Sequence, residues 1–145
     1  MKVLSQETPP LKVEIRHLER LRFEGVNSEG KKIVMDGKPP FGDGSAPSPM
    51  ELLLMALGGC TAMDVVTILT KKRVKFEDFR VEVEGKRREN HPKIYTHIKV
   101  RYYFKGDIPQ KAVEQAIRLS MEKYCSVSAM LKAVAKVEWE YTIEK

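Results

Sequence analysis

Cys60 and Cys125 are the two cysteines of this 145-residue chain, and their spacing frames the chemistry that the sequence could support. Cys60 lies in the most apolar stretch, residues 50–66, and Cys125 directly follows an amphipathic segment. A buried thiol can be no more than a small hydrophobic side chain. Two thiols that a fold brings together can instead carry out redox chemistry, in which one attacks and the other resolves the oxidised product.

The helix that carries Cys60 is predicted over residues 49–72 from its start signals. Ser48 suits the N-cap position and Pro49 the first helical position. Glu51 stands three residues after Ser48, which completes the S-x-x-E pattern of a capping box. This role explains Glu51 fully, so we favour it over a catalytic one.

Apolar residues cover every side of this helix, and two glycines interrupt it. An all-round apolar helix is buried in a core or in a subunit interface. A domain of this size would struggle to enclose it, which predicts a homodimer. Gly58 and Gly59 each cost roughly 0.5–1 kcal/mol relative to alanine. A close backbone approach, or an open space beside Cys60, would offset that cost.

The elements around the helix predict an α+β fold in a single domain, residues 1–145, although the length also allows two small, closely packed halves. Residues 11–37 read as an antiparallel meander because apolar and polar side chains alternate between turns. A Gly/Pro-rich loop, residues 37–47, leads into the helix. Residues 79–144 predict strand, strand, helix, helix and strand in that order.

The net charge of +6 and the pI of about 9.3 permit an anionic partner but do not require one. The basic clusters, residues 71–75 and 86–88, lie where elements end, and cations at a helix C-terminus complement its dipole. The sequence has no zinc-finger, RNP or helix-turn-helix pattern. Nucleic-acid binding is therefore a minor alternative, supported only by charge.

The compartment is expected to be the cytoplasm, and no membrane partner is expected. The first residues lack the apolar core of a signal peptide. The uncharged stretch 52–63 is shorter than the ~20 residues of a membrane-spanning helix. In a reducing compartment, two cysteines are more often reduced or catalytic than joined in a structural disulfide.

No metal or cofactor is expected from the sequence, since His17, His91 and His97 have no metal-type spacing to the cysteines. Asp64 lies four residues after Cys60, on the same helix face. It could orient a group across a dimer or pair with a nearby lysine, and the lysine pairing is favoured.

Two segments, residues 48–64 and 122–127, resemble the OsmC/Ohr family of osmotically inducible and organic hydroperoxide resistance proteins. The resemblance extends over nearly the whole chain and is closer to a less-characterised OsmC-like subgroup. It implies antiparallel sheets around a long central helix and an intertwined homodimer with two interfacial sites. The implied activity is thiol-dependent reduction of organic hydroperoxides without metal or flavin, with an external dithiol as reductant.

By this resemblance, Cys60 is the peroxidatic cysteine and Cys125 the resolving cysteine. An N-terminal arginine, here Arg22, would favour the Cys60 thiolate, because burial alone raises a thiol pKa. The family's glutamate position is occupied by Met50, and the nearest carboxylate, Glu51, is rotated by about 100° on a helix. Met50 supports an alternative function: a non-catalytic dimer that binds a hydrophobic ligand in its interfacial pocket.

Overall fold

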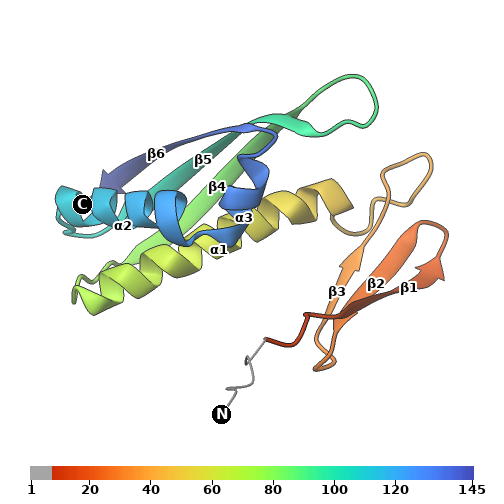
Figure 1. Cartoon of the computed structure of the whole chain (residues 1–145), viewed down its shortest axis with the longest axis horizontal. Helices are drawn as coiled ribbons and strands as arrows, with labels where there is room; N and C mark the ends of the chain where they lie inside the picture. Colours follow the sequence, from red (N-terminus) through yellow and green to blue (C-terminus); the bar gives the residue numbers. More distant parts are fainter. Residues whose placement is uncertain (1–7) are drawn as a thin grey trace, which may run out of the picture. The chain divides into compact units, whose positions relative to one another are not determined.

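The structure of the protein is a computed structural model that describes residues 8–145. The chain divides into two compact units, Met1–Leu52 and Leu53–Lys145, and each is described here by itself. Both contain a three-stranded sheet, and the helices belong to the second part of the chain (Figure 1). This is the α+β class that the sequence predicts.

The first unit is an antiparallel meander in which β2 is the central strand. Its strands are β1 (Val13–Glu19), β2 (Arg22–Asn27) and β3 (Lys32–Met35). Asn27 sets the turn between β2 and β3, because its side-chain oxygen accepts hydrogen bonds from the backbone N–H groups of Glu29 and Lys31, each at 2.9 Å. Such side-chain to backbone bonds are the reason asparagine is common in turns.

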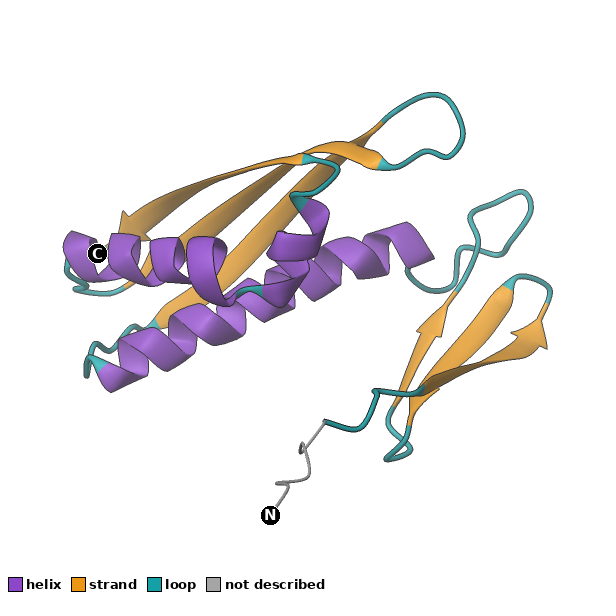
Figure 2. Ribbon diagram, in the orientation of Figure 1, coloured by secondary structure: helices purple, strands orange, loops and turns teal. Residues whose placement is uncertain are grey.

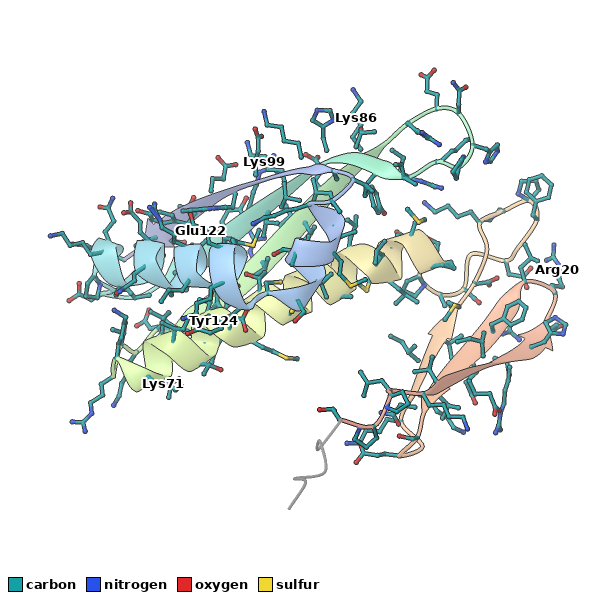
Figure 3. The ribbon with its side chains drawn as sticks, viewed as in Figure 1. Arg20, Lys71, Lys86, Lys99, Glu122 and Tyr124 are labelled. Carbon is teal, nitrogen blue, oxygen red and sulfur yellow. The ribbon has the colours of Figure 1, made fainter. Side chains whose placement is uncertain are left out.

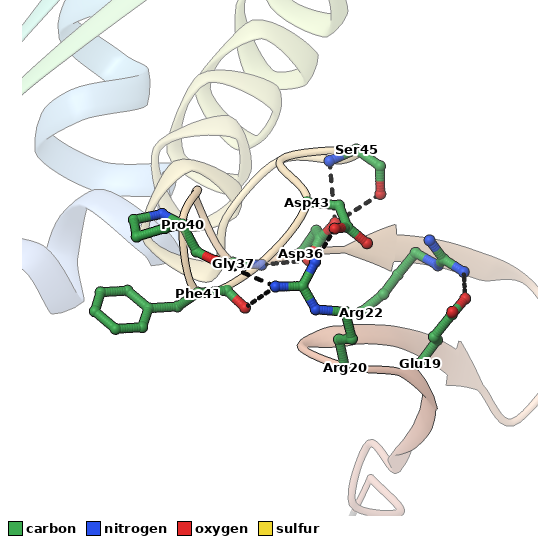
Figure 4. A network of polar contacts seen from close by, with 9 residues as sticks. All are labelled: Glu19, Arg20, Arg22, Asp36, Gly37, Pro40, Phe41, Asp43 and Ser45. Carbon is green, nitrogen blue, oxygen red and sulfur yellow. Dashed lines mark hydrogen bonds and ion pairs between the residues drawn. The ribbon is translucent and has the colours of Figure 1, made fainter.

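The Gly/Pro-rich loop after β3 is held by Asp36 and Arg20 (Figure 4). Asp36 is 2% exposed and accepts hydrogen bonds from the hydroxyl and backbone N–H of Ser45, at 2.6 and 3.0 Å. Arg20 forms an ion pair with Asp43 and donates to the backbone oxygens of Pro40 and Phe41. These contacts order a segment that its sequence alone leaves irregular.

The second unit places its helices on one face of a sheet (Figure 2). The helices are α1 (Pro49–Lys71, whose first turn belongs to the first unit), α2 (Gln110–Leu119), the π-helix η1 (Ser120–Tyr124) and α3 (Ser126–Leu131). The strands are β4 (Asp78–Arg87), β5 (Tyr95–Lys105) and β6 (Lys136–Glu144), in the order β4-β5-β6. The capping box that starts α1 is present, with Ser48 N–H donating to Glu51 at 2.9 Å and Glu51 N–H donating to the Ser48 hydroxyl at 3.3 Å.

The expectation of purely antiparallel sheets is wrong for one strand pair. β4 and β5 are antiparallel, but β5 and β6 are parallel. The chain between β5 and β6 passes through α2, η1 and α3, and a helical crossover of this kind returns a strand in the same direction. The hairpin between β4 and β5 needs only a short loop, so that pair keeps the antiparallel sense.

The core of the second unit lies between α1, α2 and the inner face of β5. Its fully buried residues include Leu57, Val65 and Leu69 of α1, Val100 and Tyr102 of β5, and Val113, Ala116 and Ile117 of α2. The outer face of the sheet is charged, with Arg101 paired to Glu82 and Glu140 at 3.1 and 2.9 Å. Exposed pairs of this kind contribute little to stability, so burial beneath the helices holds this unit together.

The two glycines of α1 meet different surroundings. A Cβ at Gly58 would lie 3.0 Å from Val83 Cγ2 on β4, whereas a Cβ at Gly59 would have no atom within 4 Å. Gly58 therefore allows the close approach of helix and sheet, and Gly59 faces open space next to Cys60. Both explanations offered by the sequence hold, one for each glycine.

Part of α1 is long and apolar enough to cross a membrane by length and composition alone. The core helix of a globular domain passes the same test. Leu57, Val65 and Leu69 are fully buried against the second unit's own elements, and Thr61 hydrogen-bonds to β5. These contacts bury one face of α1 within the second unit, and the expectation of a cytoplasmic protein without a membrane partner stays a prediction.

The two glycines give a matched pair of substitutions. We expect Gly59→Ala to raise the free energy of unfolding by about 0.5–1 kcal/mol, because alanine favours the helix and meets nothing there. Gly58→Ala should lose this gain and become neutral or destabilising, because crowding against Val83 costs about 1 kcal/mol or more. Urea unfolding of both variants tests this, and equal effects at the two positions would contradict the packing.

Asp36 gives the first unit a dependence on pH. Hydrogen bonds from Ser45 lower the pKa of Asp36 below its ordinary value. Its stabilisation is therefore present above the unfolded-chain pKa of about 3.9 and is lost as the pH falls through the lower folded value. We expect Asp36→Asn to melt at a lower temperature than the native protein at pH 7, with the difference shrinking below about pH 4. The exposed Glu29→Gln should match the native protein throughout, and a pH-independent deficit in Asp36→Asn would contradict this account.

Candidate functional site

The two thiols lie together in the second unit, and a carboxylate lies beside them. Cys60 and Asp64 are one helical turn apart on α1, and Cys125 lies between η1 and α3. The two sulfur atoms and a carboxylate oxygen of Asp64 all lie within 4.8 Å of one another. Both cysteines are free thiols, Cys60 half-buried and Cys125 buried at 3% exposure.

The π-helical turn η1 positions Cys125. The backbone N–H of Cys125 donates to Ser120 O at 2.7 Å, five residues back. In an α-helix, the side chains of residues five positions apart point about 140° away from each other around the helix axis. The wider π-helical turn instead keeps Ser120 and Cys125 on the same, buried side. Turns of this type are often found at functional sites.

Cys125 also begins α3. Its sulfur accepts the Ser128 N–H at 3.4 Å, and its carbonyl oxygen accepts the Ser128 hydroxyl at 3.1 Å. Burial raises the pKa of the Cys125 thiol, and the neighbouring Cys60 raises it further, while the N–H of Ser128 opposes both. At neutral pH Cys125 is therefore a thiol rather than a thiolate, which suits a resolving cysteine better than an attacking one.

A chain of buried hydroxyl groups runs from the core to Asp64. The Thr61 hydroxyl lies 2.6 Å from the Tyr102 hydroxyl and 2.7 Å from the Ser120 hydroxyl. Ser120 donates to Asp64 Oδ2 at 2.9 Å. Thr61, Ser120 and Tyr102 are fully buried, so this chain ties α1, η1 and β5 together in the interior.

The carboxylate fixes the direction of every proton in that chain. Ser120 donates to Asp64, and a hydroxyl group has a single proton to donate. Ser120 then accepts from Thr61, and Thr61 accepts from Tyr102. Burial raises the pKa of Tyr102, so its hydroxyl keeps the proton it donates. The chain thus holds Asp64 in place beside both thiols.

Arg22 and Glu51, the other predicted site residues, belong to the first unit. Arg22 is at the start of β2 and forms an ion pair with Glu19 at 2.9 Å. Glu51 forms the capping box, and its hydrogen bonds with Ser48 lower its pKa. The predicted action of Arg22 on Cys60 stays a prediction, and the capping role of Glu51 is the one that the structure contains.

A pocket of about 400 Å³ lies next to Asp64. Ile68 and Leu119 give it apolar walls, and Lys71 and Tyr124 also line it (Figure 3). Because Asp64 is one of its lining residues, the pocket approaches the two thiols. Further polar and charged side chains complete the lining, so the pocket combines apolar walls with groups that can orient a small molecule.

Three residues of the site, Thr61, Tyr102 and Ser120, were not identified from the sequence. Threonine next to a cysteine, tyrosine in an alternating strand and serine in an amphipathic helix are ordinary in those places. The sequence favours a lysine partner for Asp64, whereas the structure pairs it with Ser120, which is 56 residues away and beyond any local spacing. One available signal was the inward position of Ser120 in the apolar repeat of its helix, because a buried hydroxyl needs a partner.

Several known proteins resemble this chain in sequence and in fold. The family profile described as OsmC-like protein matches residues 42–140. Protein YhfA of Escherichia coli K12 is 42% identical over 134 residues, which cover 92% of this chain and 98% of that protein. A hypothetical protein from Aquifex aeolicus VF5 is 40% identical, with a TM-score of 0.80 and coverage of 95% of this chain and 100% of that chain.

A more distant structural neighbour is an organic hydroperoxide resistance protein OsmC from Legionella pneumophila. It is 14% identical with a TM-score of 0.72, over 94% of this chain and 99% of that chain, and at this identity it supports the fold alone. The fold is that of a small α+β protein whose central helix carries a cysteine. The chain belongs to the OsmC-like protein family.

The hydroxyl chain gives a stability prediction with a matched control. We expect Tyr102→Phe to lower the free energy of unfolding by about 1–2 kcal/mol, because the buried Thr61 hydroxyl loses its donor. Tyr103→Phe, on the outer face beneath Arg80, should change stability by less than about 0.5 kcal/mol. Chemical unfolding of both variants measures the difference, and equal effects would contradict a structural role for the buried hydroxyl.

Proposed function

We propose that this protein is a thiol-dependent peroxidase that reduces organic hydroperoxides. The observation that carries the proposal is the placement of two free thiols within 4.8 Å in a half-buried site. One thiol can then be oxidised by a peroxide, and the other is close enough to resolve it. The neighbouring pocket of about 400 Å³ has apolar walls, which suit an alkyl hydroperoxide better than hydrogen peroxide.

In the first step, the Cys60 sulfur attacks the terminal oxygen of the hydroperoxide. A sulfur–oxygen bond forms and the oxygen–oxygen bond breaks, so the sulfur is oxidised to a sulfenic acid and the peroxide is reduced to an alcohol. The alcohol leaves with the proton that Cys60 gave up, and Asp64 is near enough to carry that proton. Cys60 takes this role because it is the more accessible of the two thiols.

In the second step, the Cys125 sulfur attacks the oxidised sulfur of Cys60. A disulfide forms, the sulfur–oxygen bond breaks, and water leaves with the Cys125 proton. Bridging needs a sulfur–sulfur distance of about 2.05 Å, so the two side chains must move together. An external dithiol restores both thiols by exchange and becomes a disulfide itself.

The homodimer and the role of Arg22 are part of this proposal. Exposed apolar side chains on α1, Met55 at 54% and Met63 at 72%, support a second subunit that covers this helix. Arg22 would supply the cation that favours the Cys60 thiolate. A cytoplasmic, reducing location would keep both cysteines ready to react.

A second candidate function is the binding of a hydrophobic ligand without catalysis. It is favoured by Met50, which stands where the family's glutamate is expected, and by the pocket beside Asp64. In this alternative, the two thiols would react with peroxide no faster than free cysteine does.

The test is the loss of free thiols from the reduced protein during titration with cumene hydroperoxide and, separately, hydrogen peroxide. We expect two thiols per chain to be lost, about tenfold or more faster with the organic peroxide, because burying a few CH₂ groups contributes at least ~1.4 kcal/mol. Cys60→Ser should abolish the rapid reaction.

The Cys125→Ser variant is the matched control. It keeps the attacking thiol and should lose one thiol per chain rather than two, with a sulfenic acid that a dimedone probe can trap. If the unaltered protein lost its thiols no faster than free N-acetylcysteine does, the result would contradict the proposed peroxidase activity and favour the ligand-binding function.

A further inference from the structure

We propose that the reduced protein binds a thiophilic divalent cation of the Zn²⁺ type through Cys60, Cys125 and Asp64. The proposal uses the same residues as the peroxidase site but does not require peroxidase activity. Zn²⁺ is bound in proteins by thiolate sulfur and carboxylate oxygen, most often with four ligands in a tetrahedron. Three protein ligands leave the fourth position for water or a substrate group.

The distances are near those that such an ion needs. With Zn–S bonds of about 2.3 Å, two sulfurs of a tetrahedral site lie ~3.8 Å apart. The three ligand atoms already lie within 4.8 Å of one another, so adjustments of about 1 Å would complete the site. Cys60 and Asp64 are on successive turns of one rigid helix, which fixes the direction from which both ligands approach.

The ligands are supported by their own hydrogen bonds, as metal ligands commonly are. Ser120 donates to Asp64 Oδ2 at 2.9 Å, which leaves the other carboxylate oxygen for the ion. The Ser128 N–H donates to Cys125 Sγ at 3.4 Å, a contact that stabilises a thiolate. Both supports come from residues of regular elements, Ser120 in η1 and Ser128 in α3.

The chemistry of the ligand atoms favours a cation. Two thiol sulfurs and a carboxylate oxygen converge on one small site, and none of the three ligands carries a positive charge. A bound divalent ion displaces the thiol protons, so that both sulfurs bind it as thiolates. The histidine spacing of the sequence predicts no metal site, whereas the proposed ligand set contains no histidine.

The experiment is a titration of reduced, metal-free protein with Cd²⁺ in the absence of peroxide. We expect one ion per chain and a thiolate-to-cadmium charge-transfer band, with Zn²⁺ competing for the same site. Asp64→Asn should weaken Zn²⁺ binding by at least about tenfold, and Ser120→Ala by about tenfold through its support of Asp64. Asp107→Asn, which removes a carboxylate elsewhere in the chain, should leave the affinity unchanged.

A second measurement does not depend on any variant's folding. Zn²⁺ should protect both thiols of the unaltered protein from alkylation by a maleimide. No charge-transfer band, half an ion per chain, no protection, or an unchanged affinity in a folded Asp64→Asn would each overturn the three-ligand site. Because no peroxide is used, metal binding and peroxidase activity can fail separately.

Discussion

The buried Thr61 hydroxyl is the point on which the site depends. It joins α1 to Tyr102 on β5 and to Ser120 on η1, and through Ser120 it holds Asp64. Each unpaired hydroxyl in this interior would cost about 1–3 kcal/mol, so the three elements can pack in this register only if the chain of donors is complete. The same register brings Cys125 to Cys60.

The site concentrates three acidic groups in a small, partly buried volume, which makes its charge state the main physical question. Burial raises the pKa of Cys125, and the neighbouring thiol raises it further. A nucleophilic Cys60 needs a positive charge nearby, and two thiolate ligands need the charge of the metal ion that they bind. The proposed Arg22 contact and the proposed divalent cation are two ways of supplying that charge, and they would favour different states of the protein, one reactive and one at rest.

Much of the fold follows from local sequence signals, but the most informative parts of the site do not. The Ser48, Pro49 and Glu51 start signal predicts where α1 begins. Alternation predicts β1 to β4, and β-branched and aromatic content predicts β5, because these features depend on neighbouring residues. The parallel pairing of β6 and the π turn before Cys125 depend on how the helices cross the sheet, which no local pattern records. The pairing of Asp64 with Ser120 is likewise a product of tertiary packing.

The measurement that tests the central claim most directly is the mapping of the disulfide in protein oxidised by less than one equivalent of an organic hydroperoxide. Digestion without reduction, followed by mass spectrometry, identifies which cysteines are joined and whether they come from one chain. The account predicts an intrachain bridge between Cys60 and Cys125. A bridge between chains, or Cys60 oxidised to a sulfinic acid with Cys125 still a free thiol, would contradict it.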